Sequence, residues 1–168
     1  MPVSEDDLMR TLAGLEIAAE TVRHPPVFTV EESKALRGDL DGAHTKNLFL
    51  KDKKGRLWLV VALEDRVVDL KDLRHRIGAA TLSFGRPELL VEVLGIEPGS
   101  VTPFAVINDP DVRVQVVLDA GLLDHQRLNF HPLTNAATTA ISPDGLMTFL
   151  RATGHEPALV RFPDAGDG

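Results

Sequence analysis

Cysteine is absent from the 168 residues of this chain, and basic residues are outnumbered by acidic ones. Without cysteine the protein can form no disulfide, no thiolate nucleophile and no sulfur-ligated metal cluster. The 18 lysines and arginines stand against 25 acidic residues, which gives a net charge of −7. This balance argues against a general nucleic-acid binder but leaves room for a local basic patch.

Long apolar runs are also missing. The longest run, Leu57 to Leu63, spans seven residues, whereas a membrane helix needs roughly 20. The N-terminal segment carries Glu5, Asp6 and Asp7 near its start, unlike the basic and then apolar pattern of a secretory signal. We therefore expect a cytoplasmic protein that does not enter a membrane.

Several familiar catalytic motifs are absent. The chain has no Gly-rich dinucleotide fingerprint, no phosphate-binding loop, no HExxH zinc motif and no GxSxG elbow. Its six histidines lack metal-ligand spacing, since His125 and His131 are six residues apart and no pair is spaced by four. We expect neither a metal site nor a cofactor.

Hydrophobic periodicity and turn residues predict a mixed α+β fold. Residues 46–51 and 57–63 flank a loop that contains Gly55, a pattern typical of a β-hairpin. The neighbouring strands look like hairpins, so we expect an antiparallel-rich sheet, extended by residues 67–69 and surrounded by helices. The helices are expected over residues 4–19, 71–77, 87–94 and 143–153, with one more after Thr29.

The length and composition are those of one soluble domain. Hydrophobic residues make up 43% of the chain and charged residues 26%, which suits a globular protein with one sizeable core. No repeat or linker interrupts the pattern. We expect a single domain over residues 1–163, followed by a frayed tail over residues 164–168.

Four features are candidates for chemistry, each with a plainer alternative. Lys46, followed by Asn47, is a solvated lysine or one whose ammonium grips a phosphate or an ester carbonyl. Residues 99–103 form a plain connection or a loop that aims backbone groups at a substrate. His131 is a structural or a catalytic histidine. A basic cluster is a solvated turn or a place for phosphate contacts, and it comprises Lys51, Lys53, Lys54, Arg56 and Arg74.

Four segments resemble, in the expected order, the YbaK/ProX superfamily of aminoacyl-tRNA deacylases. They cover residues 24–32, 44–52, 99–104 and 129–133, and together they span nearly the whole chain. Their Lys-Asn-Leu-Phe-Leu and Phe-His-Pro-Leu signatures are most similar to the free-standing alanyl-tRNA(Pro) deacylase branch, also called the PrdX or ProXp-ala group. The chain departs from the family at Gly85, where alanine is usual, and at Ala136, where threonine is common.

The resemblance implies a YbaK-like fold and a trans-editing task. The task is to hydrolyse alanine that prolyl-tRNA synthetase has wrongly attached to tRNA(Pro). The conserved lysine of the family corresponds to Lys46, its GxxxP loop to Gly99–Pro103, and its pocket histidine to His131. The implied partners are aminoacylated tRNA(Pro) and prolyl-tRNA synthetase, with no metal and no cofactor.

An aminoacyl ester is already activated, so positioning and electrostatics suffice for its hydrolysis. In this reading the ribose hydroxyl of the substrate and the backbone at Gly99 position the attacking water. Lys46 holds a phosphate or stabilises charge on the carbonyl, while His131 and Asn47 orient the aminoacyl end and Phe28 forms an apolar wall. The remaining loop residues assigned to substrate binding are Ser100, Val101, Thr102 and Pro103.

Selectivity follows from size. A synthetase pocket shaped for proline admits the smaller alanine, and an editing pocket too small for proline spares the correct product. The basic cluster would contact the tRNA backbone in a salt-sensitive way. Three alternatives stay open: a cysteinyl-tRNA(Pro) deacylase, a non-catalytic tRNA-binding or synthetase-associated module, and a small-metabolite binding protein.

Overall fold

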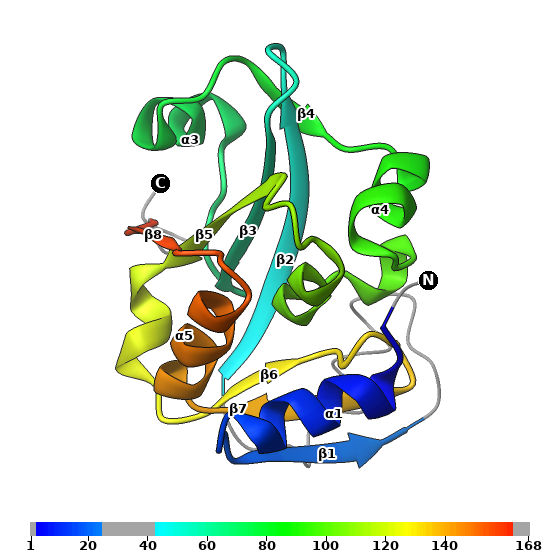
Figure 1. Cartoon of the computed structure of the whole chain (residues 1–168). Helices are drawn as coiled ribbons and strands as arrows, with labels where there is room; N and C mark the ends of the chain where they lie inside the picture. The colour runs from blue at the N-terminus through cyan, green and yellow to red at the C-terminus, as the bar shows by residue number, and fades with distance from the viewer. Residues whose placement is uncertain (1–2, 25–42, 163–168) are drawn as a thin grey trace.

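The computed structural model describes residues 3–24 and 43–162, and its strands form one bent sheet (Figure 1). The strand order is β1–β7–β6–β2–β3–β5–β8, with β4 paired to β2 beside this path. The strands are β1 (Ala19–Arg23), β2 (Ala43–Asp52), β3 (Leu57–Leu63), β4 (Leu82–Phe84), β5 (Val114–Asp119), β6 (Leu128–Phe130), β7 (Ala137–Ile141) and β8 (Ala158–Val160).

Four α-helices and three 3-10 helices in the described residues connect these strands. The α-helices are α1 (Glu5–Gly14), α3 (Leu70–Ile77), α4 (Pro87–Leu94) and α5 (Pro143–Ala152). The 3-10 helices are η2 (Pro98–Ser100), η3 (Pro103–Asn108) and η4 (Ala120–Asp124).

The long strand β2 joins the two parts of the sheet. It pairs with β3 in the antiparallel hairpin that the sequence predicts, with Lys46 opposite Ala62. Its first residues, Ala43 and His44, pair in parallel with β6, and its last residues pair antiparallel with β4. The mixed, antiparallel-rich α+β sheet is thus confirmed, although β3–β5 and β5–β8 are also parallel pairs joined by helical connections.

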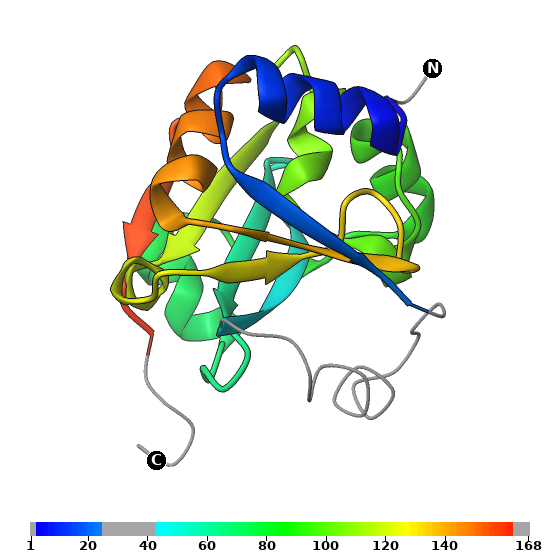
Figure 2. The same ribbon diagram turned by 90° about the horizontal axis from the view of Figure 1, so that it is seen from below.

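Both faces of β3 are buried, which explains why its sequence is an unbroken apolar run. Leu59 packs in one core cluster with residues of α1, α4 and α5, whereas Trp58 packs in a second cluster with residues of α3 and β4. Helices α1, α4 and α5 lie on one side of the strands (Figure 2). The sheet is therefore covered on both faces at its centre.

Two sequence predictions of local structure are wrong. The first helix does begin at a capping box between Ser4 and Asp7, but it ends at Gly14 and not at residue 19. The chain turns through Glu16, whose φ is 59°, so that Ala19 can pair with Ile141 in β7. Residues 67–69 form no strand, because they lead directly into α3.

Other predictions concern residues outside the described ranges. The helix expected after Thr29 and the candidate wall residue Phe28 both lie there. In the described part of the chain, no helix has both the length and the apolar character needed to span a membrane.

Candidate functional site

A small polar cavity lies where β2 meets β6 and β7. Its volume is about 80 Å³, and the side chains that line it come from β2, β6, β7 and the residue that follows β6. The parallel pairing of His44 with Asn129 brings these segments together from distant parts of the sequence. The lining residues are His44, Thr45, Asn47, Asn129, Phe130, His131 and Thr138.

The imidazole of His131 is held in one tautomer. Its Nδ1 lies 3.1 Å from the carbonyl oxygen of Ala137, and because a carbonyl only accepts, Nδ1 carries the hydrogen. Burial lowers the pKa of His131; the Ala137 carbonyl opposes this shift, and the nearby His24 adds to it. His131 is therefore neutral at pH 7, with Nε2 left as a hydrogen-bond acceptor.

Asn47 supplies an acceptor that has no partner among the described residues. Its Oδ1 is buried and makes no hydrogen bond there. Around it the cavity wall is internally bonded: Thr45 Oγ1 donates to the Asn129 carbonyl at 3.0 Å, and His24 Nε2 lies 2.8 Å from Thr138 Oγ1. A buried acceptor left unpaired costs about 1–3 kcal/mol, so the cavity suits a ligand that brings its own N–H or O–H donor.

Lys46 lies beside Asn47 in sequence but on the other face of β2, since successive strand residues alternate. Its ammonium donates to the carbonyl of Arg66, and Arg66 Nε in turn donates to Asp119 Oδ2 at 2.9 Å. Asp119 is fully buried and also accepts from the backbone amide of Leu63. The structure thus brings Asn47 and His131 together and leaves the Lys46 ammonium outside the lining of this cavity.

The Gly99–Pro103 loop does not line this cavity. Ser100, Thr102 and Pro103 are buried, and Thr102 Oγ1 accepts from the backbone amide of Phe104 at 3.3 Å. Val101 is partly buried against the first core cluster. The Phe104 ring meets the ring of Phe130 edge to face, with centroids 5.9 Å apart. This contact connects the segment after the loop to β6, the strand that ends just before His131.

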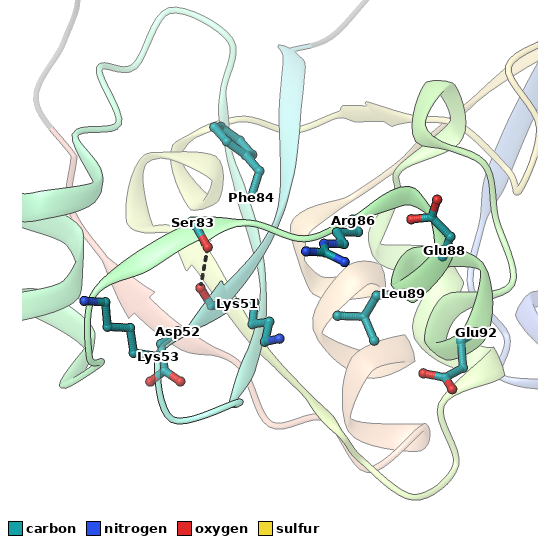
Figure 3. Close-up of a pocket in the computed structure, with 9 residues that line it drawn as sticks. All are labelled: Lys51, Asp52, Lys53, Ser83, Phe84, Arg86, Glu88, Leu89 and Glu92. Atoms are coloured by element: carbon teal, nitrogen blue, oxygen red, sulfur yellow. Dashed lines mark hydrogen bonds between the residues drawn. The ribbon is translucent and has the colours of Figure 1, made fainter.

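The basic cluster is divided between different environments. Lys51 and Lys53 line a large groove between β4 and α4 (Figure 3). Arg56 is engaged in the hairpin itself, where Nε donates to Asp52 at 3.0 Å and the guanidinium lies 5.1 Å from the Trp58 ring centroid.

The other two basic residues lie apart from that groove. Lys54 is exposed in the hairpin turn, where its backbone amide donates to Asp52 Oδ1. Arg74 lines a separate groove beside α3 and donates to Thr81 Oγ1 at 3.0 Å.

Five lining residues were not singled out by the sequence: His44, Thr45, Asn129, Phe130 and Thr138. The first four belong to the segments 44–52 and 129–133 that carry the family resemblance, so a signal for them existed. Thr138 had none, because only the register of β7 against β1 and β6 places it here. Within residues 3–24 and 43–162 no group of three or more His, Asp or Glu side chains is arranged to hold a metal ion.

Comparison with known proteins identifies relatives along nearly the whole chain. The family model of the aminoacyl-tRNA editing domain matches residues 24–149. A Bos taurus protein named prolyl-tRNA synthetase associated domain-containing protein 1 is 44% identical over 160 residues, which cover 92% of this chain and 93% of that protein.

A bacterial relative and a solved structure extend the comparison. The prolyl-tRNA editing protein ProX of Acetoanaerobium sticklandii is 38% identical over 145 residues, with 86% of this chain and 88% of that protein covered. The crystal structure of hypothetical protein APE2540 superposes with a TM-score of 0.73 at 22% identity, covering 92% of this chain and 97% of that one. At that identity the superposition supports the fold alone.

Proposed function

The chain belongs to the aminoacyl-tRNA editing domain family, and on that premise we propose that it is a trans-editing deacylase whose substrate is alanyl-tRNA(Pro). The reaction is hydrolysis of the ester between alanine and the terminal ribose. The partner is aminoacylated tRNA(Pro). The names of the relatives, which refer to prolyl-tRNA synthetase and to prolyl-tRNA editing, support this choice.

The observation that carries the proposal is the size and polarity of the His131 cavity. At about 80 Å³ it has roughly half the volume of the cavity of about 150 Å³ that binds benzene in another protein. It therefore favours the methyl group of alanine over the five-membered ring of proline. Its walls carry amide, hydroxyl and imidazole groups, which suit the amino and hydroxyl groups around an aminoacyl ester.

The two central side chains have complementary parts in this proposal. The unpartnered Oδ1 of Asn47 accepts a hydrogen bond from the ammonium group of the aminoacyl substrate. The Nε2 of His131 is a neutral acceptor, and it orients the ribose hydroxyl or the attacking water. The ester is activated already, so orientation by these two groups is the main contribution to the rate.

Lys46 and the Gly99 loop act from outside the lining of the cavity. The ammonium of Lys46 holds a phosphate of the terminal nucleotide once it leaves the Arg66 carbonyl, and Arg66 is itself fixed by Asp119. The Gly99–Pro103 loop precedes Phe104, which packs on Phe130, so its proposed part is to position this wall of the cavity. Phe28 remains the proposed apolar wall, and Ser100, Val101, Thr102 and Pro103 are proposed to support the loop beneath the substrate.

Single-turnover hydrolysis of alanyl-, cysteinyl- and prolyl-tRNA(Pro) by the purified protein tests the substrate. We expect rapid loss of alanine, with proline spared because its ring does not enter the cavity. Faster loss of cysteine than of alanine would replace the proposed substrate by cysteinyl-tRNA(Pro). Failure to hydrolyse any of the three would contradict the proposal and favour a non-catalytic binding module.

Substitutions test the assigned roles in the same assay. Asn47→Ala, His131→Ala and Lys46→Ala should each fold and lose most of the deacylation rate, by about 10²-fold or more. His125→Ala is the matched control, because this histidine is exposed and lies outside the cavity. Wild-type turnover in one of the three variants would remove that residue from the mechanism.

A further inference from the structure

A large groove with a volume of about 840 Å³ lies between β4 and α4, and it shares no lining residue with the His131 cavity (Figure 3). One wall comes from the end of β2 and from β4, and it contributes Lys51, Lys53 and Phe84. The other wall comes from the start of α4 and contributes Arg86 and Leu89. In Figure 3 the side chains of Lys51 and Arg86 project toward the space between the strand and the helix.

We propose that this groove binds the single-stranded 3′-terminal nucleotides of the tRNA that precede the aminoacylated one. Phe84 stacks on a base, and Lys51 and Arg86 contact phosphates. The proposal rests on the proposed function, because it gives the substrate of the His131 cavity a path along the protein surface. It also makes the groove the place where affinity for the nucleic acid arises, separate from the place where hydrolysis occurs.

Phe84 is the observation that points to a base. Its exposed fraction is 64%, the highest among the large hydrophobic residues that the structure describes as exposed. An exposed ring in a groove with cationic neighbours is the arrangement that single-stranded nucleic-acid sites use, since every base has a face that can stack. The backbone beside this ring is fixed, because the amide of Gly85 donates to the Phe49 carbonyl at 2.9 Å.

The strand β2 connects the groove to the cavity. Asn47, Phe49 and Lys51 share one face of this strand, since side chains alternate along it. Asn47 lines the cavity and Lys51 lines the groove, and the four residue steps from one to the other span about 13 Å. The ring of Phe49 between them is buried in the core, so the nucleic acid has to pass over the surface around Phe49 to reach Lys51.

The charges of the groove are asymmetric. Glu88 and Glu92 lie one turn apart on the α4 wall, and Glu92 Oε2 is 3.8 Å from Arg113 Nη1. Asp52, near the other end, is buried and accepts from backbone amides and from Arg56, so it presents little free charge. Phosphates are therefore favoured on the side of Lys51 and Arg86, and the acidic helix face keeps them from spreading across α4.

Binding of tRNA(Pro) with and without its three terminal nucleotides tests the proposal. Phe84→Ala should weaken the binding of intact tRNA about tenfold and leave the truncated tRNA unaffected. Phe84→Trp should restore the wild-type affinity, because it keeps an aromatic face. Leu123→Ala is the matched control, since Leu123 is also an exposed apolar residue but lies outside this groove.

The salt dependence gives a second readout that loss of folding would not imitate. Lys51→Ala should reduce the slope of log affinity against log salt by about 0.7, the value for one phosphate contact on a single strand. Lys71→Ala should not change the slope, because Lys71 belongs to α3 and lines another groove. Equal binding by wild type, Phe84→Ala and Lys51→Ala would overturn the proposal, as would an equal loss for intact and truncated tRNA.

Turnover of alanyl-tRNA(Pro) by the wild-type protein, measured in parallel, separates the two proposals. Groove-dependent binding without turnover would support the groove and contradict the deacylase function. Turnover that is unchanged in KM by Phe84→Ala and Lys51→Ala would support the function and contradict the groove. An increase in KM in both variants at an unchanged saturating rate supports both.

Discussion

At the scale of single residues, the protonation state of His131 decides how the cavity can act. Burial lowers the pKa of this imidazole, and His24 contributes to the same direction. His24→Gln should therefore raise the pKa of His131, and the acid limb of the pH–rate profile should move to higher pH with it. NMR titration of the histidine ring protons measures this, with His125→Gln as a control. An unchanged pKa would show that His24 does not contribute to the shift.

The sign of the linked stability change follows from the same shift. The pKa of His131 is lower in the folded chain than the usual value near 6.5, so the unfolded chain binds the proton more readily. Stability therefore rises with pH through the window below about 6.5 and is lost as the pH falls through it. His131→Ala should remove this contribution from a series of urea unfolding curves. The same pH dependence in wild type and variant would contradict the assignment.

Gly85 is the second residue with a testable consequence. A Cβ added at this position would overlap the ring of Phe49, which is buried in the first core cluster. The family resemblance has alanine as the usual residue here, so the Phe49 ring in this chain occupies space that an alanine would claim. Gly85→Ala should cost about 1–3 kcal/mol of unfolding free energy, measured by urea denaturation. A neutral or stabilising effect would mean that the ring shifts freely.

At the scale of elements, Asp52 fixes the β2–β3 hairpin. It is buried, and it accepts from the backbone amides of Lys54, Arg56 and Ala80 and from the Arg56 side chain. Burial by itself raises the pKa of Asp52, but these donors together hold its pKa below the usual value. Because the folded pKa is depressed, the stability it contributes is present above about pH 4 and is lost as the pH falls further.

Asp52→Asn should weaken the hairpin, because the amide replaces one acceptor oxygen by a donor. We expect a loss of about 1–3 kcal/mol in unfolding free energy at pH 7. The difference between variant and wild type should shrink as the pH is lowered below 4, where wild-type Asp52 is protonated too. Urea unfolding at several pH values measures this. A constant difference over that range would contradict the proposed role of the ionised carboxylate.

The sequence predicts correctly those elements that have strong local signals. The hairpin follows from the apolar run of β3 and the turn at Gly55, and α4 follows from Pro87 at its start and Gly95 after its end. The predicted first helix extends beyond Gly14, because Leu15 and Ala19 continue its apolar periodicity. In the structure, Ala19 belongs to β1 and pairs with Ile141. Periodicity does not report this long-range pairing.

The sequence predicts the candidate site only in part, because the site too depends on contacts between residues that are distant in sequence. Asn47 and His131 could be chosen from family signatures, but the position of the Lys46 ammonium depends on Arg66 and on the buried Asp119. Thr138 lines the cavity only because of the register in which β7 pairs with its neighbouring strands. No local pattern contains that information, since it arises when strands distant in sequence pair.

At the scale of the whole molecule, the charge of −7 and the proposed RNA substrate are reconciled by local placement. Lys51 and Arg86 face a groove, whereas Arg56 is bound to Asp52 in the hairpin. Because the proposed phosphate contacts are limited to the groove cations Lys51, Lys53 and Arg86, binding should be weak for RNA in general and dependent on the 3′ end. The salt slope measured for intact tRNA should accordingly correspond to two or three contacts, about −1.4 to −2.1. A slope above twice that value would indicate a wider basic surface.

The only tryptophan, Trp58, provides a probe that tests whether the chain unfolds as a single domain. Trp58 lies in the second core cluster, on the α3 side of the sheet, while the helices α1, α4 and α5 pack on the other side. Because alternate residues of β3 belong to the two clusters, neither cluster can come apart without disturbing the strand that serves the other. Trp58 fluorescence and far-UV circular dichroism should therefore give coincident urea unfolding transitions. Separate midpoints would show that the two sides of the sheet unfold independently, and the chain would then have to be treated as two cooperative units.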